Sequence, residues 1–385
     1  MPITQGLPVS AERQLAFLRK ISRILDEAKF TSTYKFALLL SLTNIAVKNG
    51  DDSDAELTIE LDDVAREFVK LYWGMAQPYP DEPKDILLQN RQASKPAKVI
   101  TLLAPYASTG YARHTRHRVH ATAAASVVAK TRATIAKDVL YRLQTVGPSN
   151  EAAAVRSDRF LYEHPSDAAG CAVLKQITLK PGVAACMRSL RTVIAAMVQA
   201  RWALWVREHN PSLGPDRNLE AFLFGTNRVT LREFAAWLYE LQGARCFYTH
   251  AKLASPDAGA VDHFLPRARY VLDEPVNLVL ASTKANGDKS DHVASEAYLK
   301  LWADRNTNLQ LNDLPDSFAA RLAPGALPAT WQDARSVAAW MYEAAERDEV
   351  QAWNGEKQFA RVGRDWRGIL GSAERKSPVE IPRAI

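Results

Sequence analysis

The stretch Gly259-Ala260-Val261-Asp262-His263-Phe264-Leu265-Pro266 is a short β-type run that ends in an acid and a histidine. A second such run is Asn277-Leu278-Val279-Leu280-Ala281. Both are apolar and short enough to predict β-strands. The residues from Thr283 onward, which include Asn286 and Lys289, predict a helix. Two strands followed by a helix make a ββα unit, and this unit decides the fold expected for the C-terminal part of the chain.

The residue types in this unit suit hydrolysis of a phosphodiester bond. That reaction needs a base that makes water nucleophilic, and a cation that holds the phosphate and neutralises charge on the departing oxygen. His263 suits the first task. Asp262 and the side-chain carbonyl of Asn286 offer the oxygen ligands that a hard ion such as Mg²⁺ prefers. Adjacent residues on a strand point to opposite faces, so Asp262 and His263 can share a site only where the strand ends or twists.

The segment from Cys246 to Trp302 resembles an HNH nuclease of the His-Me finger (ββα-metal) superfamily. It is similar in particular to the HNH domain of CRISPR RNA-guided nucleases, which shows a Val-Asp-His start, a central Asn and a closing Asn-x-x-Lys-Ser-Asp. The matching stretches here are Val261-Asp262-His263, Asn277-Leu278 and Asn286-Gly287-Asp288-Lys289-Ser290-Asp291. We call Cys246–Trp302 the HNH segment.

The resemblance implies a role for each matching residue. His263 would be the general base, and Asp262 and Asn286 would bind Mg²⁺ or Mn²⁺. Asn277 would hold the loop at His263 by bridging backbone groups. Lys289 would contact phosphate or face solvent, and we expect the contact. The implied activity is metal-dependent hydrolysis of DNA that leaves 5′-phosphate and 3′-hydroxyl ends.

The HNH segment departs from many single-domain relatives, which carry two Cys-x-x-Cys pairs around a structural zinc. The equivalent positions here are Cys246/Thr249 and Ser282/Ala285. A single thiol cannot cage zinc, so no structural zinc is expected. We expect apolar and aromatic packing to hold the unit together instead. The residues expected to provide it are Phe247, Tyr248, Phe264 and Leu265.

Positive charge gathers in the basic segment, Ile86–Asn150. It has ten Lys and Arg residues and one acid, whereas the whole chain has a formal net charge of +6. Clustered cations release counterions when they meet phosphates, so this segment predicts contact with DNA, with a solvated basic face as the alternative. The HNH segment has no such surplus. The candidate nucleic-acid contacts are Arg113, Arg116, Arg118, Lys130 and Arg132, with Arg267 and Arg269 beyond the first predicted strand.

Helical periodicity dominates the rest of the chain. An apolar stripe predicts an amphipathic helix over Ala11–Phe30, and long helices are expected at Val183–His209 and Ser336–Arg347. The expected fold is therefore mainly α, with a helical N-terminal region and a C-terminal HNH finger embedded in helices. The predicted parts are a helical unit at 1–80, a basic helical region at 81–210, an HNH nuclease domain at 211–310 and a C-terminal helical extension at 311–385.

The remaining composition narrows the setting. The three cysteines lie far apart, with no Cys-x-x-Cys pair, which indicates a reducing compartment, and the cytoplasm is the expected location. The N-terminus lacks the features of a signal peptide. The most apolar stretches, Phe36–Val47 and Thr192–Val206, are too short to span a bilayer and are expected to be buried helices. No membrane association is therefore expected.

These observations predict a metal-dependent HNH endonuclease that cuts DNA. Two alternatives of other classes stay open: a nucleic-acid-binding module with a vestigial finger, and an RNase-type toxin. By analogy with similar architectures, the helical region would act as a sensor or docking surface for other proteins in bacterial defence against phage. The sequence leaves the oligomeric state open.

Overall fold

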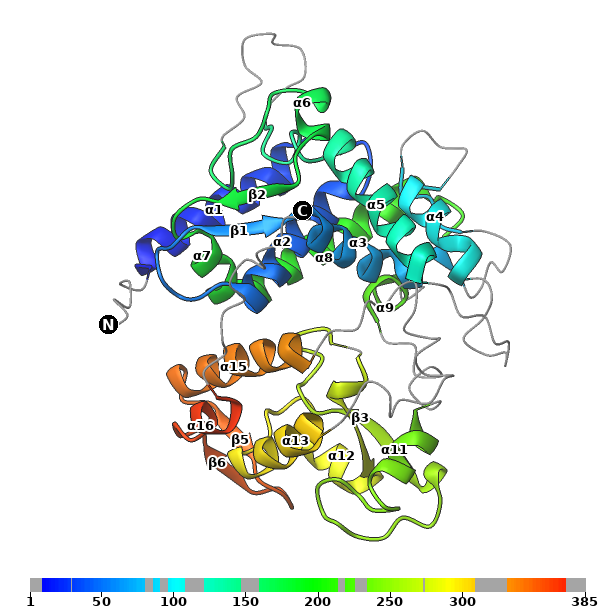
Figure 1. Ribbon diagram of the computed structural model, residues 1–385, viewed down its shortest axis with the longest axis vertical. Helices are drawn as coiled ribbons and strands as arrows, with labels where there is room; N and C mark the ends of the chain where they lie inside the picture. Colours follow the sequence, from blue (N-terminus) through cyan, green and yellow to red (C-terminus); the bar gives the residue numbers. More distant parts are fainter. Residues whose placement is uncertain are drawn as a thin grey trace, which may run out of the picture. The chain divides into compact units, whose positions relative to one another are not determined.

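A computed structural model describes most of the chain and divides it into two compact units (Figure 1). The first unit is Met1–Thr230 with Asn312–Pro328, and the second is Leu231–Leu311 with Ala329–Ile385. Helices dominate and every described sheet has two strands, which confirms the mainly α fold class. The described residues are 9–28, 30–79, 86–90, 96–107, 121–146, 159–213, 219–225, 234–272, 274–308 and 331–371.

Helices build the first unit. They are α1 (Ala11–Glu27), α2 (Tyr34–Asn49), α3 (Leu61–Trp73), α4 (Lys98–Ala107), α5 (Ala121–Asp138), α6 (Ala168–Ala172), α7 (Val183–Ser189), α8 (Arg191–His209) and α9 (Leu219–Phe224). Two short strands, β1 (Leu57–Glu60) and β2 (Gln176–Leu179), pair antiparallel. The sequence analysis did not predict this small sheet. Each strand has only four residues, and its partner lies far away in the chain.

Helix α2 forms the centre of the first unit. It packs against α3, α7 and α8, and most of its side chains are buried, as expected for Phe36–Val47. The ring of Trp202 on α8 lies 5.3 Å from the ring of Tyr72 and 6.1 Å from the ring of Phe36. The Trp202 indole donates a 2.7 Å hydrogen bond to Gln89, so the polar atom of this buried ring has a partner.

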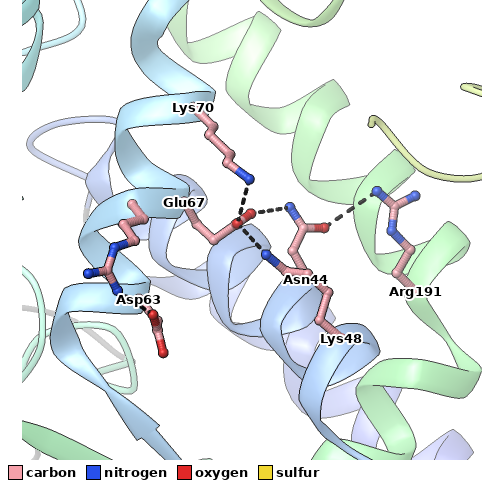
Figure 2. Close-up of polar contacts among 7 residues, drawn as sticks. Asn44, Lys48, Asp63, Glu67, Lys70 and Arg191 are labelled. Carbon is pink, nitrogen blue, oxygen red and sulfur yellow. Dashed lines mark hydrogen bonds and ion pairs between the residues drawn. The ribbon is translucent and has the colours of Figure 1, made fainter. Parts of the chain in front are cut away.

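A buried ionic cluster joins three helices of this core (Figure 2). The carboxylate of Glu67 on α3 lies 2.7 Å from Lys48 Nζ and 3.7 Å from Lys70 Nζ, and it accepts a 3.2 Å hydrogen bond from Asn44. Arg191 of α8 donates to Asn44 at 3.4 Å. Burial would raise the pKa of Glu67, but the charges of both lysines and the hydrogen bonds from Lys48 and Asn44 lower it to about 2. We call these five residues the Glu67 cluster.

The single long helix predicted over Val183–His209 is instead two helices. Helices α7 and α8 meet at Leu190 and are bent by 80°. Arg188 and Arg191, on either side of the bend, are both buried and reach α2, where Arg188 donates to the Val47 carbonyl. Among the described residues no single helix is long and apolar enough to cross a membrane, and this bent pair meets that criterion only when its two helices are taken together.

The second unit contains the HNH segment and the C-terminal elements. Its helices are α11 (Ala235–Leu241), α12 (Thr283–Lys289), α13 (Glu296–Asn308), α15 (Trp331–Arg347) and α16 (Trp366–Leu370). Its strands are β3 (Gly259–His263), β4 (Leu278–Ser282), β5 (Gln351–Trp353) and β6 (Phe359–Arg361). Strands β3 and β4 form one antiparallel pair, and β5 and β6 form another.

Backbone hydrogen bonds connect the C-terminal elements to the HNH segment. Trp353 of β5 donates to the Val293 carbonyl and accepts from the Ser295 amide, both at 2.8 Å. Tyr342 of α15 donates a 2.6 Å hydrogen bond to the carbonyl of Ala294. Residues 331–371 and the HNH segment therefore share one core.

Candidate active site

The predicted ββα unit is present. Strands β3 and β4 pair antiparallel from Gly259 opposite Ser282 to His263 opposite Leu278. Helix α12 follows directly and contacts both strands. Ser282 begins this helix because its hydroxyl accepts a 3.2 Å hydrogen bond from the amide of Ala285. The strands lie within a few residues of the predicted runs, and the helix begins at the expected Thr283.

Asp262 is held by a hydrogen bond and an ion pair at the end of this unit. Its Oδ2 atom accepts a 2.6 Å hydrogen bond from the Tyr248 hydroxyl and lies 3.1 Å from Lys289 Nζ. Burial and the neighbouring Asp262 charge raise the pKa of Tyr248 well above its usual value. The Tyr248 hydroxyl therefore keeps its proton and donates a hydrogen bond to the Asp262 carboxylate. Asp262 retains 11% exposure of its side chain, so it lies at the edge of the core.

Lys289 is fully buried. Its ammonium group donates a 2.9 Å hydrogen bond to the backbone carbonyl of His263, in addition to its ion pair with Asp262. This placement corrects the expected contact with phosphate, and it also differs from the alternative of a solvent-facing lysine. A side chain without exposed surface reaches neither solvent nor substrate, and its charge is instead compensated inside the protein, as buried charges require.

His263 is the last residue of β3 and is 8% exposed. The strand ends directly after His263, which pairs with Leu278, so the requirement that the strand end or twist at this point is met only on one side of His263, and the sharing of a site by Asp262 and His263 stays a prediction. Immediately after it, the amide of Phe264 donates to the Asn277 carbonyl at 2.8 Å. The end of β3 is therefore tied to the start of β4.

Asn277 fixes the loop that follows His263. It is fully buried, and its side-chain oxygen accepts a 2.7 Å hydrogen bond from the Leu265 amide. Its amide nitrogen donates to the carbonyls of Leu265 and Leu272 at 3.1 and 2.9 Å. The side chain bridges backbone groups, the arrangement that the resemblance implies.

Asn286 lies one helical turn before Lys289 on α12 and is half-buried. Residues three apart share a helix face, and the contacts of Lys289 show that this face meets the end of β3. Asn286 is thus on the side of α12 where Asp262 and His263 lie. A carboxylate and an amide oxygen there fit a hard divalent ion that takes its other ligands from water and phosphate. Among the described residues no group of three His, Cys, Asp or Glu could hold a metal.

Two of the four positions equivalent to a structural zinc site, Cys246 and Ser282, are joined by a hydrogen bond. The amide of Ser282 donates to Cys246 Sγ at 3.2 Å. Burial would raise the pKa of the Cys246 thiol, but hydrogen bonds from the Thr249 side chain and from backbone amides, including that of Ser282, lower it. With one thiol among the four positions, these residues do not fit a zinc cage.

Aromatic packing takes part in holding the unit. The Phe264 ring stacks on Trp302 of α13 with 4.9 Å between centroids, and Phe247 meets Phe264 edge to face at 6.0 Å. Phe247, Phe264 and Leu265 are buried, as the sequence analysis expected.

Helix α13 also contributes polar contacts that sequence reasoning missed. The side chains of Trp302, Arg305 and Asn306 all donate to the carbonyl of Val276, at 2.7, 2.8 and 2.9 Å. Val276 immediately precedes Asn277, so these bonds fix the residue that holds the His263 loop. The close spacing of these three polar or aromatic residues along the chain is the only signal in the sequence.

Gln242, just after α11, fixes the other strand. Its side chain donates to the Leu280 carbonyl and accepts from the Leu280 amide, both at 2.8 Å. A side-chain amide here makes the two hydrogen bonds that a neighbouring strand would make. This contact was also missed, because it joins residues that are 38 positions apart.

The two arginines after β3 are half-buried. Burial lowers the pKa of Arg269, whereas the charges of Asp348 and Asp291 raise it. Arg269 therefore faces acids of its own unit. The expected contacts of Arg267 and Arg269 with a nucleic-acid backbone stay predictions.

Only part of the basic segment is described. Arg113, Arg116 and Arg118 lie outside the described residues. On α5, Lys130 is exposed, and Arg132 lies 3.3 Å from the carboxylate of Asp62 in an ion pair with both side chains about 40% exposed. To contact a DNA phosphate, Arg132 would therefore have to give up its ion pair with Asp62.

Comparison with known proteins finds a family match in each unit. Residues 246–295 match the family described as HNH endonuclease, so the second unit contains an HNH domain of a nuclease. That description does not extend to CRISPR nucleases, and the narrower likeness stays a sequence-based expectation. No curated protein matches the chain. Residues 14–221, more than half of the chain, match the family described as a domain of unknown function (DUF8808). The chain therefore belongs to the DUF8808 family and joins its characteristic domain to an HNH endonuclease domain.

Proposed function

We propose that this protein is a metal-dependent endonuclease that hydrolyses DNA phosphodiester bonds, with Asp262, His263 and Asn286 at its active site. The observation that carries the proposal is the end of β3. There an acid and a histidine are consecutive, the strand stops, and Lys289 of α12, three residues after Asn286, contacts both of them.

Each residue has a task that its chemistry supports. His263 accepts a proton from the attacking water, for which an imidazole is suited near neutral pH. Asp262 and Asn286 supply oxygen ligands to Mg²⁺ or Mn²⁺. Such an ion, when bound, neutralises charge on the phosphate and on the departing oxygen. Asn277 keeps the backbone after His263 in place, and the hydrogen bonds of α13 to Val276 support it.

The first unit, which contains the DUF8808 match, would deliver the substrate. The basic segment belongs to this unit and carries the cationic surplus that the HNH segment lacks. Reversing the charges of Arg113, Arg116 and Arg118 should weaken DNA binding and flatten its salt dependence, and unchanged affinity would refute this division of labour. We also propose that the nuclease acts in bacterial defence against phage.

Nicking of supercoiled plasmid tests the activity. The wild-type protein should convert plasmid to the open-circular form with Mg²⁺ or Mn²⁺, and EDTA should stop it. His263→Ala and Asn286→Ala should each lose about 100-fold or more in rate. His292→Ala is the matched control, because His292 is an exposed histidine of the same unit. Full cleavage by His263→Ala would overturn the assignment of the base.

RNA has to be assayed as the alternative substrate. The HNH segment retains its candidate base and both candidate metal ligands, which favours a nuclease over a vestigial binding module. Parallel assays on single-stranded RNA and on plasmid of matched concentration separate a DNase from an RNase-type toxin. Metal-dependent cleavage of RNA with intact plasmid would contradict the DNA substrate and retain the nuclease.

A further inference from the structure

The side chains of Tyr248 and Lys289 converge on one oxygen of Asp262. We propose that Tyr248 and Lys289 are positioning residues that hold Asp262 and the end of β3 in the geometry needed to bind a hard divalent cation. This inference rests on the proposed function, because it assigns Asp262 to the metal. Neither residue needs to touch substrate.

The hydrogen bond from Tyr248 and the ion pair with Lys289 both meet Oδ2 and leave the other carboxylate oxygen to a ligand. The Tyr248 hydroxyl and Lys289 Nζ lie 2.6 and 3.1 Å from Oδ2. Within the part of the chain that the structure describes, no donor is recorded at Oδ1. A ligating carboxylate is commonly oriented by hydrogen bonds to its other oxygen, and these outer contacts decide how well it binds metal. The geometry at Asp262 matches that division between its two oxygens.

Lys289 links two consecutive residues of the site. Its ammonium lies between the Asp262 carboxylate and the His263 carbonyl, 2.9 Å from the latter. A single buried group thus fixes both the acid and the backbone that carries the candidate base. This contact ties the Asp262 carboxylate to the backbone of the next residue at the end of the strand.

Tyr248 is itself immobilised by packing. Its ring meets those of Phe247, Tyr298 and Trp353 at 5.2, 5.3 and 5.1 Å, in each case edge to face. Only 3% of the residue is exposed. A donor with a fixed ring orientation can define the position of its acceptor, whereas a mobile donor would follow it.

A buried ammonium is costly unless paired, and apolar residues of similar size often replace buried ion pairs without loss of stability. Stability alone therefore gives weak reason for a charged residue at position 289. The alternative to positioning is a purely structural pair, and the two differ in one respect. A structural pair affects how much protein is folded, whereas a positioning pair changes the metal affinity of protein that is folded.

Tyr248→Phe is the decisive variant, because it removes one hydroxyl and keeps the packed ring. Mn²⁺ binding to the full chain, measured by electron paramagnetic resonance of the free ion, should weaken about 10-fold. Plasmid nicking at subsaturating Mn²⁺ should fall in parallel. Tyr342→Phe is the matched control: Tyr342 is fully buried in the same unit, and its hydroxyl donates to a backbone carbonyl at the same 2.6 Å. It should lose comparable thermal stability and keep wild-type Mn²⁺ affinity.

Lys289→Met provides the second variant. It should reduce nicking about 10-fold or more even at saturating Mn²⁺, because the His263 carbonyl is released as well. Tyr248→Phe carries the test if Lys289→Met does not fold. Unchanged Mn²⁺ affinity in Tyr248→Phe, or equal weakening in Tyr342→Phe, would overturn the positioning role. A wild-type protein that neither binds Mn²⁺ nor nicks plasmid would instead overturn the proposed function itself.

Discussion

The two units each contain a carboxylate that pairs with lysine in the protein interior, and the two carboxylates are held differently. Glu67 in the first unit has both oxygens engaged, by Lys48 and Lys70 on one side and by Asn44 on the other. Asp262 in the second unit has both of its donors on a single oxygen. The Glu67 cluster is closed, whereas the Asp262 site leaves one oxygen available.

This difference separates two uses of buried charge. A closed cluster joins helices α2, α3 and α8 and can do no more than stabilise their arrangement. An oriented carboxylate with an available oxygen can bind an additional ligand. A strong pKa shift by itself does not mark a ligand site, because the pKa of Glu67 is lowered to about 2 although both of its carboxylate oxygens are already engaged. The comparison predicts that changes at Asp262 affect activity and that changes at Glu67 affect stability.

The largest expected effect is on the activity of Asp262→Asn. The amide keeps an oxygen for Tyr248 and Lys289 but loses the negative charge that a divalent ion requires. Nicking should fall about 1,000-fold, which corresponds to the several kcal/mol that a metal supplies to such a reaction. The melting temperature should also fall, because the fully buried Lys289 loses its compensating charge, so rates are compared at a temperature where the variant is folded. Initial rates on supercoiled plasmid and calorimetric melting measure the two quantities, and retained nicking by the folded variant would reverse the comparison.

The next effect is on the stability of the first unit in Glu67→Gln. The substitution leaves the charges of Lys48 and Lys70 without their carboxylate, which costs about 3–5 kcal/mol when one partner of a buried pair is removed. Hydrogen–deuterium exchange should accelerate in peptides from α2 and α3. Peptides from β3, β4 and α12 should exchange as in the wild type.

An exposed pair supplies the control for that experiment. Arg23 and Glu27 form an ion pair on α1, with both side chains about half exposed. Glu27→Gln should change stability by less than about 1 kcal/mol. If Glu67→Gln behaved like Glu27→Gln, burial would not be what makes the Glu67 cluster important.

Local patterns were enough to predict the ββα unit. Its strands and helix are adjacent in the chain, the acid and the histidine end the first strand, and the two asparagines lie just before the second strand and within the helix. Asn277 bridges backbone groups within twelve residues of itself, so its arrangement could also be expected from the resemblance. The apolar stripe of α1 was predicted in part: Ile21, Ile24 and Leu25 are buried, but Leu15 is 51% exposed.

Contacts between distant segments could not be predicted in the same way. Tyr248 was expected only as an apolar packing residue, because nothing in the periodicity of its segment indicates that its hydroxyl meets Asp262. Lys289 was expected to contact phosphate, because nothing in its segment indicates that its ammonium group meets Asp262 and the His263 carbonyl instead. At the bend between α7 and α8, Arg188 and Arg191 meet α2, which is more than 130 positions away in the chain. Tertiary partners decide each of these features, and hydrophobic periodicity does not specify partners.

A smaller effect should appear in the pH dependence of the first unit. The pKa of Glu67 is lowered from 4.5 to about 2, so folding favours the ionised form. The resulting stability, about 3 kcal/mol, is fully present above pH 4.5 and is lost as the pH falls towards 2. Exchange rates in α2 and α3 at pH 5 and pH 3 measure this loss. Glu67→Gln should remove this contribution, and an equal pH dependence in that variant would assign it to other carboxylates.

The smallest effect concerns an exposed pair, Arg132 with Asp62, which extends the comparison to the surface. Because both side chains are about 40% exposed, Asp62→Asn should change stability by less than about 1 kcal/mol.

If Arg132 contacts DNA, releasing it from Asp62 should tighten binding a few-fold. Arg132→Gln should weaken binding and reduce the slope of log affinity against log salt by about one. Fluorescence anisotropy with a labelled duplex at several salt concentrations measures both. Equal slopes in wild type and Arg132→Gln would leave Arg132 as the partner of Asp62 alone, because a lost phosphate contact must change the number of ions released.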